Sequence, residues 1–237
     1  MPDTPDTTRR DFIAKALTVG GGLLAGPAVG LAAVAAVTTP NKAIYPSEDL
    51  MRDHGLLDRI LLIYEEGIRL LAGKTGDLWP IYETARIVRS YVEDFHEPLE
   101  EVFLFPRFQA RAGEQRALVD VLRHQHQAGR VLTDRILAGV QPQALKADGA
   151  REDVARTLRE YVRMYRAHES REDTVLFPAL RAIVTPKEHE SLRQAFAAKE
   201  KQLLGQNSYA RTLESLVRLE KALGMYELAD YTPKPRR

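Results

Sequence analysis

Apolar residues recur at steps of three and four along most of the chain, and this spacing predicts amphipathic α-helices. Four stripes of this kind follow one another, and no segment shows the strict alternation that is typical of a strand. The stripes cover residues 50–71, 81–103, 119–136 and 154–175. The sequence therefore predicts an all-α fold.

The connections between the four stripes are mostly short, and the longest is 140–149. Such helices with short connections predict an up-down-up-down four-helix bundle, which we place at 46–184. The segment TPKE, which begins at Thr185, then has the form of a capping box that starts a further helix. We expect residues 185–237 to hold extra C-terminal helices and a tail.

Prolines interrupt the helical pattern. Pro98 lies inside the second stripe, and Phe-Pro pairs begin at Phe105 and Phe177. A proline inside a helix removes one backbone donor and its ring clashes with the preceding turn. We therefore expect a kink at Pro98, and we expect the Phe-Pro pairs to end or bend their helices.

The first forty residues differ from the rest of the chain. Arg9 and Arg10 stand just before an uncharged run at 16–37 that is rich in glycine and alanine. This order resembles a twin-arginine export signal, which implies a periplasmic or otherwise exported protein. We expect residues 1–40 to be this signal, with cleavage near Ala33. The alternative is an uncut segment that anchors the chain, because about 20 apolar residues can span a bilayer.

Charge and composition exclude several classes of protein. The 34 basic and 33 acidic residues leave a net charge of +1. This balance argues against a nucleic-acid partner, which needs a clustered surplus of basic residues. The chain has no cysteine, so disulfides, thiolate metal sites and cysteine nucleophiles are excluded.

A histidine motif occurs twice in the chain. HEPLEEVFLFP begins at His96 and HESREDTVLFP begins at His168, 72 residues later, and His54 and His126 are also 72 residues apart. Several matches at one offset indicate a duplicated helical hairpin. Within each hairpin the two histidines are 42 residues apart, which is one helix, a turn and a helix back. We therefore expect the two imidazoles of each pair to meet at one level of the bundle.

Two glutamates accompany these histidines. Glu100 and Glu172 each follow a histidine by four residues, so each lies on that histidine's helix face, one turn along. Four imidazoles and two carboxylates in a bundle core suit a pair of mid-row metal ions, because imidazole binds iron and a carboxylate can bridge two cations. The alternative is a metal-free core in which each buried ring bonds to other protein groups.

These motifs resemble those of the hemerythrin HHE family, and the resemblance covers residues 47–184. The matching segments are His54, the HEPLE that begins at His96, the QHQ around His126 and the HESREDTVLFP that begins at His168. The resemblance implies a non-haem di-iron centre in a four-helix bundle that binds dioxygen at an open iron position. It also implies the ligands, which are His54 and His96 for one iron, His126 and His168 for the other, and Glu100 and Glu172 as bridges.

One position departs from the oxygen-carrying branch of the family. That branch has a further histidine one turn after the one that His126 matches, and here the position is Arg130. We expect water, Glu97, Glu169 or an open position to complete the second iron's shell. An open position favours reaction with dioxygen, peroxide or nitric oxide over simple reversible carriage.

Other polar residues are weaker candidates. Asp173 competes with Glu172 for the bridging role, since the carrier branch has an aspartate at that spacing, but the repeat favours Glu172. Asp58 also lies at ligand spacing after a histidine, yet its charged neighbours favour a solvated or salt-bridged carboxylate. We expect His124 and His189 on the surface.

The sequence therefore predicts a hemerythrin-like non-haem di-iron protein. We expect it to bind dioxygen or a related small molecule for sensing, scavenging or storage. Two alternatives stay open, namely a di-iron oxidase or scavenger of peroxide or nitric oxide, and a metal-free structural bundle. We expect contact with a membrane only through an uncut N-terminal segment.

Overall fold

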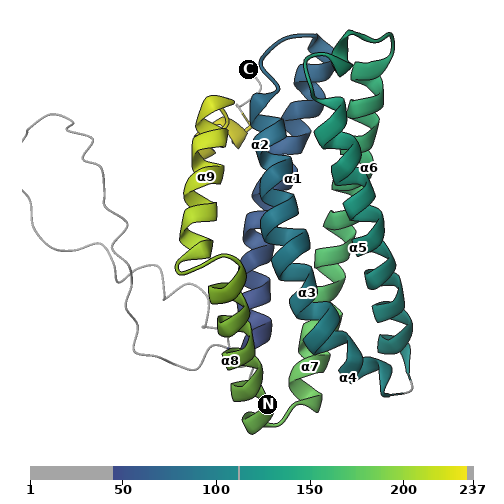
Figure 1. Cartoon of the computed structure of the whole chain (residues 1–237), viewed down its shortest axis with the longest axis vertical. Coiled ribbons are helices and arrows are strands. Elements are labelled where there is room, and N and C mark those ends of the chain that lie inside the picture. The colour runs from purple at the N-terminus through teal and green to yellow at the C-terminus, as the bar shows by residue number, and fades with distance from the viewer. Residues whose placement is uncertain (1–44, 112, 234–237) are drawn as a thin grey trace, which may run out of the picture. The chain divides into compact units, whose positions relative to one another are not determined.

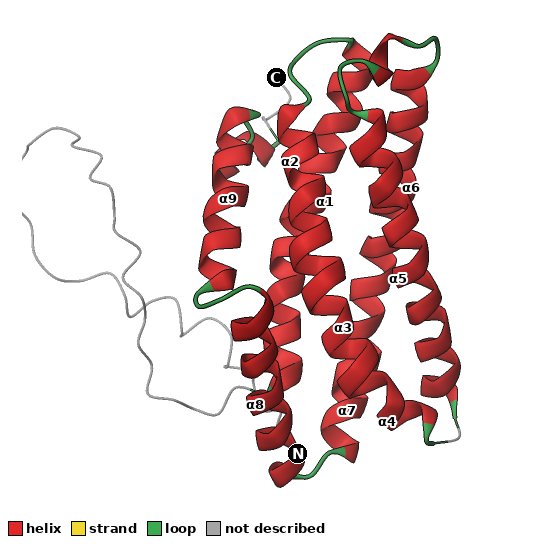
Figure 2. Ribbon diagram, viewed as in Figure 1, coloured by secondary structure: helices red, strands yellow, loops and turns green. Residues whose placement is uncertain are grey.

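The computed structural model describes residues 45–111 and 113–233. The predicted twin-arginine signal, with its cleavage site near Ala33, lies outside these residues. The described part is helical and contains no strand, which confirms the predicted all-α fold (Figure 2). No helix in 45–233, residue 112 apart, is long and apolar enough to cross a membrane.

Four helical segments, which we call legs, form the bundle (Figure 1). They run in sequence order as α1 (Pro46–Gly73); then α2 (Trp79–Ile87), η1 (Val88–His96), α3 (Glu97–Leu99), η2 (Glu100–Leu104) and α4 (Phe105–Gln109); then α5 (Glu114–Gly139); and last α6 (Ala150–Arg171), η4 (Glu172–Leu176) and α7 (Phe177–Ile183). The short 3₁₀ turn η3 (Ala144–Lys146) lies between the third and fourth legs. Helix α6 packs along α1 and α5, and α2 packs against the same two helices, as an up-down-up-down order requires.

Two further helices cover one side of the bundle. Helix α8 (Pro186–Leu203) packs against α1 and η1, α9 (Ser208–Ala222) packs against α1 and α2, and the 3₁₀ turn η5 (Leu228–Tyr231) follows. The predicted capping box is present, because the Thr185 hydroxyl accepts from the Glu188 amide at 3.3 Å while the Glu188 carboxylate accepts from the Thr185 amide at 2.8 Å. Arg59 on α1 donates to Glu220 on α9 at 2.7 Å, which ties the outer helix to the bundle.

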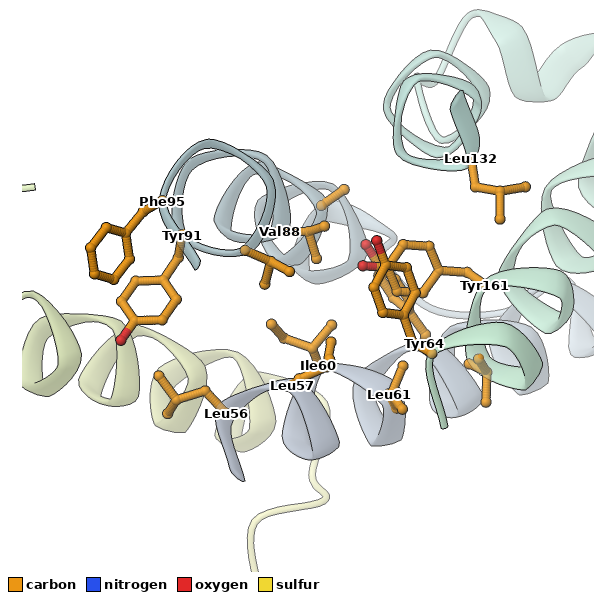
Figure 3. Packing of buried hydrophobic residues seen from close by; sticks show 14 of the residues in the cluster. Leu56, Leu57, Ile60, Leu61, Tyr64, Val88, Tyr91, Phe95, Leu132 and Tyr161 are labelled. Carbon is orange, nitrogen blue, oxygen red and sulfur yellow. The ribbon is translucent and has the colours of Figure 1, made fainter. Parts of the chain in front are cut away.

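The apolar stripes meet in one continuous core. In Figure 3, α1 side chains face η1 residues on one side and residues of α5 and α6 on the other. The residues labelled there are Leu56, Leu57, Ile60, Leu61, Tyr64, Val88, Tyr91, Phe95, Leu132 and Tyr161, each at most 8 % exposed. This core holds the polar residues of the four legs at fixed positions.

Three stretches of the second and fourth legs are π-helical rather than α-helical. These are η1, η2 and η4, and each ends two residues before a proline, namely Pro98, Pro106 and Pro178. A π-turn is wider than an α-turn, so it moves backbone carbonyls away from a proline ring that cannot donate to them. The interruption predicted at Pro98 therefore takes the form of π-helical turns on both sides of it.

Candidate metal centre

Two pairs of histidines meet inside the bundle. His54 on α1 faces His96 at the end of η1, with ring centroids 5.1 Å apart. His126 on α5 faces His168 on α6, with centroids 4.9 Å apart and their Nε2 atoms separated by 3.2 Å. All four residues are at most 5 % exposed. The structure thus brings together the partners that the 42-residue spacing predicts.

The two glutamates lie between the histidine pairs. Glu100 and Glu172 are the first residues of η2 and η4, and both are 0 % exposed. Each carboxylate faces two imidazoles, one from each hairpin. The oxygen-to-Nε2 distances are 3.6 Å from Glu100 to His96, 3.5 Å from Glu100 to His126, 3.2 Å from Glu172 to His168 and 3.4 Å from Glu172 to His54.

This cluster leaves ligand atoms without hydrogen bonds. Both oxygens of Glu100, both oxygens of Glu172 and Nε2 of His54 are buried and have no hydrogen-bond partner among the described residues. Burying such groups without partners is costly. The ligand atoms form two overlapping groups within 4.8 Å, one of His54, His96 and Glu100, and one of Glu100, His126, His168 and Glu172. Imidazole nitrogens and carboxylate oxygens at this spacing fit two bound cations.

The pKa shifts describe how the cluster balances its charge without metal. Burial and the nearby Glu172 raise the pKa of Glu100 well above its usual value. Burial opposes ionisation of Glu172, but contacts with His168 and His54 lower its pKa. Burial alone would lower the pKa of His54, yet its contacts with carboxylates raise it well above the usual value. Burial lowers the pKa of His126 to about 4. Without metal, protons on groups such as Glu100 and His54 thus offset the negative charge of the carboxylates, which bound cations would otherwise offset.

Each imidazole is also held from outside. In each case Nδ1 lies within hydrogen-bond distance of a side-chain oxygen. The residue that provides this oxygen stands next in sequence to a different one of the six ligand candidates. The pairs are His96 with Asp53 at 3.3 Å, His168 with Gln125 at 3.0 Å, His126 with Glu101 at 2.9 Å and His54 with Asp173 at 2.8 Å. Because these oxygens accept, each Nδ1 donates, and in the neutral ring that binds a metal Nε2 presents its lone pair to the cluster.

Asp173 therefore has a different position from Glu172. Asp173 contacts Nδ1 of His54 from outside and its side chain is 29 % exposed, whereas the Glu172 side chain is 0 % exposed and faces the cluster. The structure places Glu172, and not Asp173, among the inward-facing groups.

Aromatic rings cover two of the imidazoles. Phe105 stacks on His126 with centroids 5.6 Å apart and 19° between the planes, and Phe177 stacks on His54 at 5.5 Å and 23°. Both phenylalanines are 0 % exposed. The Phe-Pro pairs therefore do more than interrupt helices, because their rings cover one face of His126 and of His54.

Arg130 lies at the edge of the second histidine pair. Its Nη2 is 2.7 Å from Oε2 of Glu97 and 3.0 Å from Oε1 of Glu101. The other oxygen of Glu97 accepts from the Tyr165 hydroxyl at 2.7 Å, and burial raises the pKa of Glu97 to about 8. Ligand atoms of Glu97, Glu101 and His126 lie within 4.8 Å of one another. Of the two glutamates expected to complete the second shell, Glu97 therefore lies beside His126.

The remaining candidates lie apart from the cluster. Glu169 belongs to none of the metal-like groups within the described residues, and burial and the nearby Asp58 raise its pKa to about 8. Asp58 and His124 are exposed. His189 is partly buried, contrary to the prediction, because its ring packs edge-on against Tyr45 with centroids 4.7 Å apart.

A column of tyrosines continues from the second histidine pair. The Tyr165 ring lies 5.5 Å from His168, Tyr161 stacks on Tyr165 at 4.3 Å, and Tyr64 meets Tyr161 edge-on at 5.2 Å. All three are fully buried. Gly129 makes room for this column, because a Cβ there would lie 2.0 Å from the Tyr165 hydroxyl oxygen.

The 72-residue repeat extends beyond the six ligand candidates. The structure gives equivalent surroundings to further pairs, and apart from the repeated Phe-Pro the sequence analysis assigned these pairs no shared role, although the same offset was the signal that could have found them. These pairs are Asp53 and Gln125, Asp58 and Arg130, Glu97 and Glu169, Glu101 and Asp173, and Phe105 and Phe177. The two hairpins are thus related by an approximate twofold arrangement around the cluster.

Comparison with known proteins agrees with this geometry. The family model described as the hemerythrin HHE cation binding domain matches residues 45–180 and 136–224. The uncharacterized proteins Mb2018 of Mycobacterium bovis and Rv1995 of Mycobacterium tuberculosis are each 42 % identical over 199 residues, which is 83 % of this chain and 78 % of theirs. No solved structure matches the chain significantly. The chain therefore belongs to the hemerythrin HHE cation-binding family, as an α-helical bundle with clustered histidines and glutamates that could hold metal.

Proposed function

We propose that this protein holds two non-haem irons and binds dioxygen or a related small molecule at one of them. His54 and His96 would hold one iron, and His126 and His168 the other. Glu100 and Glu172 would bridge the two. The observation that carries this proposal is the set of five buried ligand atoms that lack hydrogen bonds and face one another.

The site's own residues support such a role in three ways. The outer hydrogen bonds fix the imidazole tautomers, so each Nε2 is ready to bind. The two carboxylates offset the charge of two cations. The rings of Phe105 and Phe177 exclude water from the imidazole faces. Bound iron would supply the redox chemistry and the position at which the small molecule binds.

The position of Arg130 bears on the ligand. No imidazole stands there to complete the second shell, and Arg130 instead holds Glu97 and Glu101. A buried carboxyl and a phenol, Glu97 and Tyr165, thus lie close to the second histidine pair. This pair of proton-bearing groups favours a second candidate, an enzyme that reduces dioxygen, peroxide or nitric oxide and needs protons to do so.

Iron content tests the first part of the proposal. The reduced chain is loaded with ferrous iron without air, desalted and analysed. We expect about two irons per chain, and we expect Glu100→Gln to lose at least one because a bridging carboxylate becomes a neutral amide. Glu93→Gln is the matched control, since Glu93 is also buried but pairs with Thr133 and Arg89 away from the cluster. If the wild-type chain kept its fold but retained no iron, the proposal would be wrong and the alternative of a metal-free structural bundle would remain.

The absorption spectrum separates a binder from an enzyme. Air should produce a new band at about 300–500 nm. Loss of this band on degassing indicates reversible binding, whereas turnover of added peroxide or nitric oxide that falls in Tyr165→Phe indicates the enzyme.

The location and partners of the protein follow from the same proposal. An iron site assembled before export suits the twin-arginine route, which carries folded proteins, so we place the protein in the periplasm or outside the cell. Its partner at the site is a small diatomic molecule such as dioxygen.

A further inference from the structure

One face of the bundle carries an open groove rimmed by arginines. The groove lies along α5 and α6 and has a volume of about 790 Å³. Its apolar floor includes Leu122 and Val162, which are buried, and Val121, which is 53 % exposed. Its charged residues are Arg159, Arg163, Arg166 and Arg171 against a single acid, Glu65. The groove is therefore apolar at its base and strongly positive at its edge.

The internal repeat shows what such a groove can hold. Six of its residues lie 72 positions after residues of the equivalent surface on the first hairpin. The residues of the open groove are Val121, Leu122, Gln125, Arg163, Ala167 and Arg171, and their counterparts are Asp49, Leu50, Asp53, Tyr91, Phe95 and Leu99. On the first hairpin this surface is covered by α8, which places Phe196 over it with only 5 % exposure. Within the part of the chain that the structure describes, the same surface thus carries an amphipathic helix on the first hairpin and none on the second.

The charges indicate which helix would fit the open half. Arg159 pairs with Glu152 at 2.9 Å and Arg166 pairs with Glu65 at 3.0 Å. Arg163 and Arg171 are exposed and have no ion-pair partner among the described side chains. A helix with apolar residues on one face and acidic residues beside them would complement both the floor and the rim.

We propose that this groove docks an acidic amphipathic helix of another protein. The α8 helix of a second copy is a poorer match, because α8 carries both basic and acidic residues and already covers its own hairpin. Docking has a route to the candidate metal centre, since Gln125 lines the groove and its Oε1 lies 3.0 Å from Nδ1 of His168. This coupling rests on the proposed function, whereas the docking itself does not.

A designed peptide tests the docking. The probe is the 18-residue α8 sequence with its four basic residues replaced by glutamate and a fluorophore at one end. Binding to the full chain is measured by fluorescence anisotropy, without added metal, so that it does not depend on the metal centre. We expect saturable binding that weakens as salt rises and that is lost when the probe carries Phe196→Ala.

Charge reversal on the chain identifies the surface. Arg163→Glu with Arg171→Glu should weaken the probe at least tenfold, or ~1.4 kcal/mol. The matched control, Arg135→Glu with Arg156→Glu, reverses two exposed arginines outside the groove and should change binding less than twofold. Circular dichroism verifies that both variants are folded.

Two outcomes overturn the proposal. If the probe does not bind, or binds both double variants alike, the groove is not an acidic-helix site. If sedimentation shows a wild-type dimer that Arg163→Glu with Arg171→Glu converts to a monomer, the occupant of the groove is a second copy of this chain.

Discussion

Gly129 gives the most direct test of the packing around the candidate centre. A Cβ at this position would lie 2.0 Å from the hydroxyl oxygen of Tyr165 and 2.8 Å from its Cζ. Tyr165 is fully buried between Tyr161 and His168, so both neighbouring rings restrict its movement. Gly129→Ala must therefore displace the ring and lengthen its hydrogen bond to Glu97.

The expected change in the free energy of unfolding is the sum of three contributions, of which two destabilise the fold and one stabilises it. Overpacking a buried site costs about 1–3 kcal/mol, and a lost hydrogen bond costs about 1 kcal/mol. Alanine regains about 1 kcal/mol of helix propensity over glycine. We expect Gly129→Ala to lower the free energy of unfolding by about 1–3 kcal/mol. Gly55→Ala is the matched control, because nothing lies within 4 Å of a Cβ there and alanine should stabilise α1 at this exposed position.

A double-mutant cycle isolates the contact. Tyr165→Phe removes the hydroxyl that the new Cβ meets at 2.0 Å, so Gly129→Ala should cost at least about 1 kcal/mol less in that background. Urea unfolding, followed by circular dichroism with all variants in the same metal state, measures each corner of the cycle. Effects that add to within about 0.3 kcal/mol, or a stabilised Gly129→Ala chain, would refute the reasoning.

Three further predictions concern charge and packing. Between pH 6.5 and 8 the chain without metal should lose stability as pH rises. The pKa values of Glu97 and Glu169 are raised to about 8 and that of His54 is also raised, so in this range the folded chain keeps protons that the unfolded chain releases. A urea midpoint that stays constant or rises with pH in the presence of chelator would contradict this. Phe177→Ala opens a cavity against His54 and should cost about 3–5 kcal/mol of unfolding free energy, whereas an effect below about 1 kcal/mol would mean that the ring does not pack as described. Arg59→Ala leaves a buried carboxylate on α9 unpaired and should speed limited proteolysis between α8 and α9, while an unchanged cleavage rate would show that α9 is held by its apolar face alone.

Periodicity predicted the helices well because the core needs an apolar face on every leg. It could not predict the form of the second leg, where the sequence suggests one kinked helix around Pro98 and the structure has π-helical turns before it and after it. The choice between a kink and a wider turn depends on which carbonyls the neighbouring helices can accommodate. That information lies in the packing and not in the local sequence.

The six ligand candidates could be found from spacing because each lies on an apolar face at a repeat position. The outer partners also lie at repeat positions, but they are polar residues off the apolar faces, so the hydrophobic pattern did not single them out. Asp53, Gln125 and Glu101 each adjoin a ligand candidate, and a neighbouring residue on a helix points about 100° away from it. Only the approach of the next helix turns these polar side chains onto an imidazole.

The crossed hydrogen bonds between the hairpins bear on how such a centre could evolve. Glu101 of the first hairpin holds His126 of the second, and Asp173 of the second holds His54 of the first. Two identical hairpins in a twofold dimer would meet the same requirements, because every contact across the axis would occur twice. Fusion into one chain frees each half to change alone. Asp58 and Arg130 occupy equivalent positions in the two hairpins but carry opposite charges. A dimer of identical hairpins could not have had this difference.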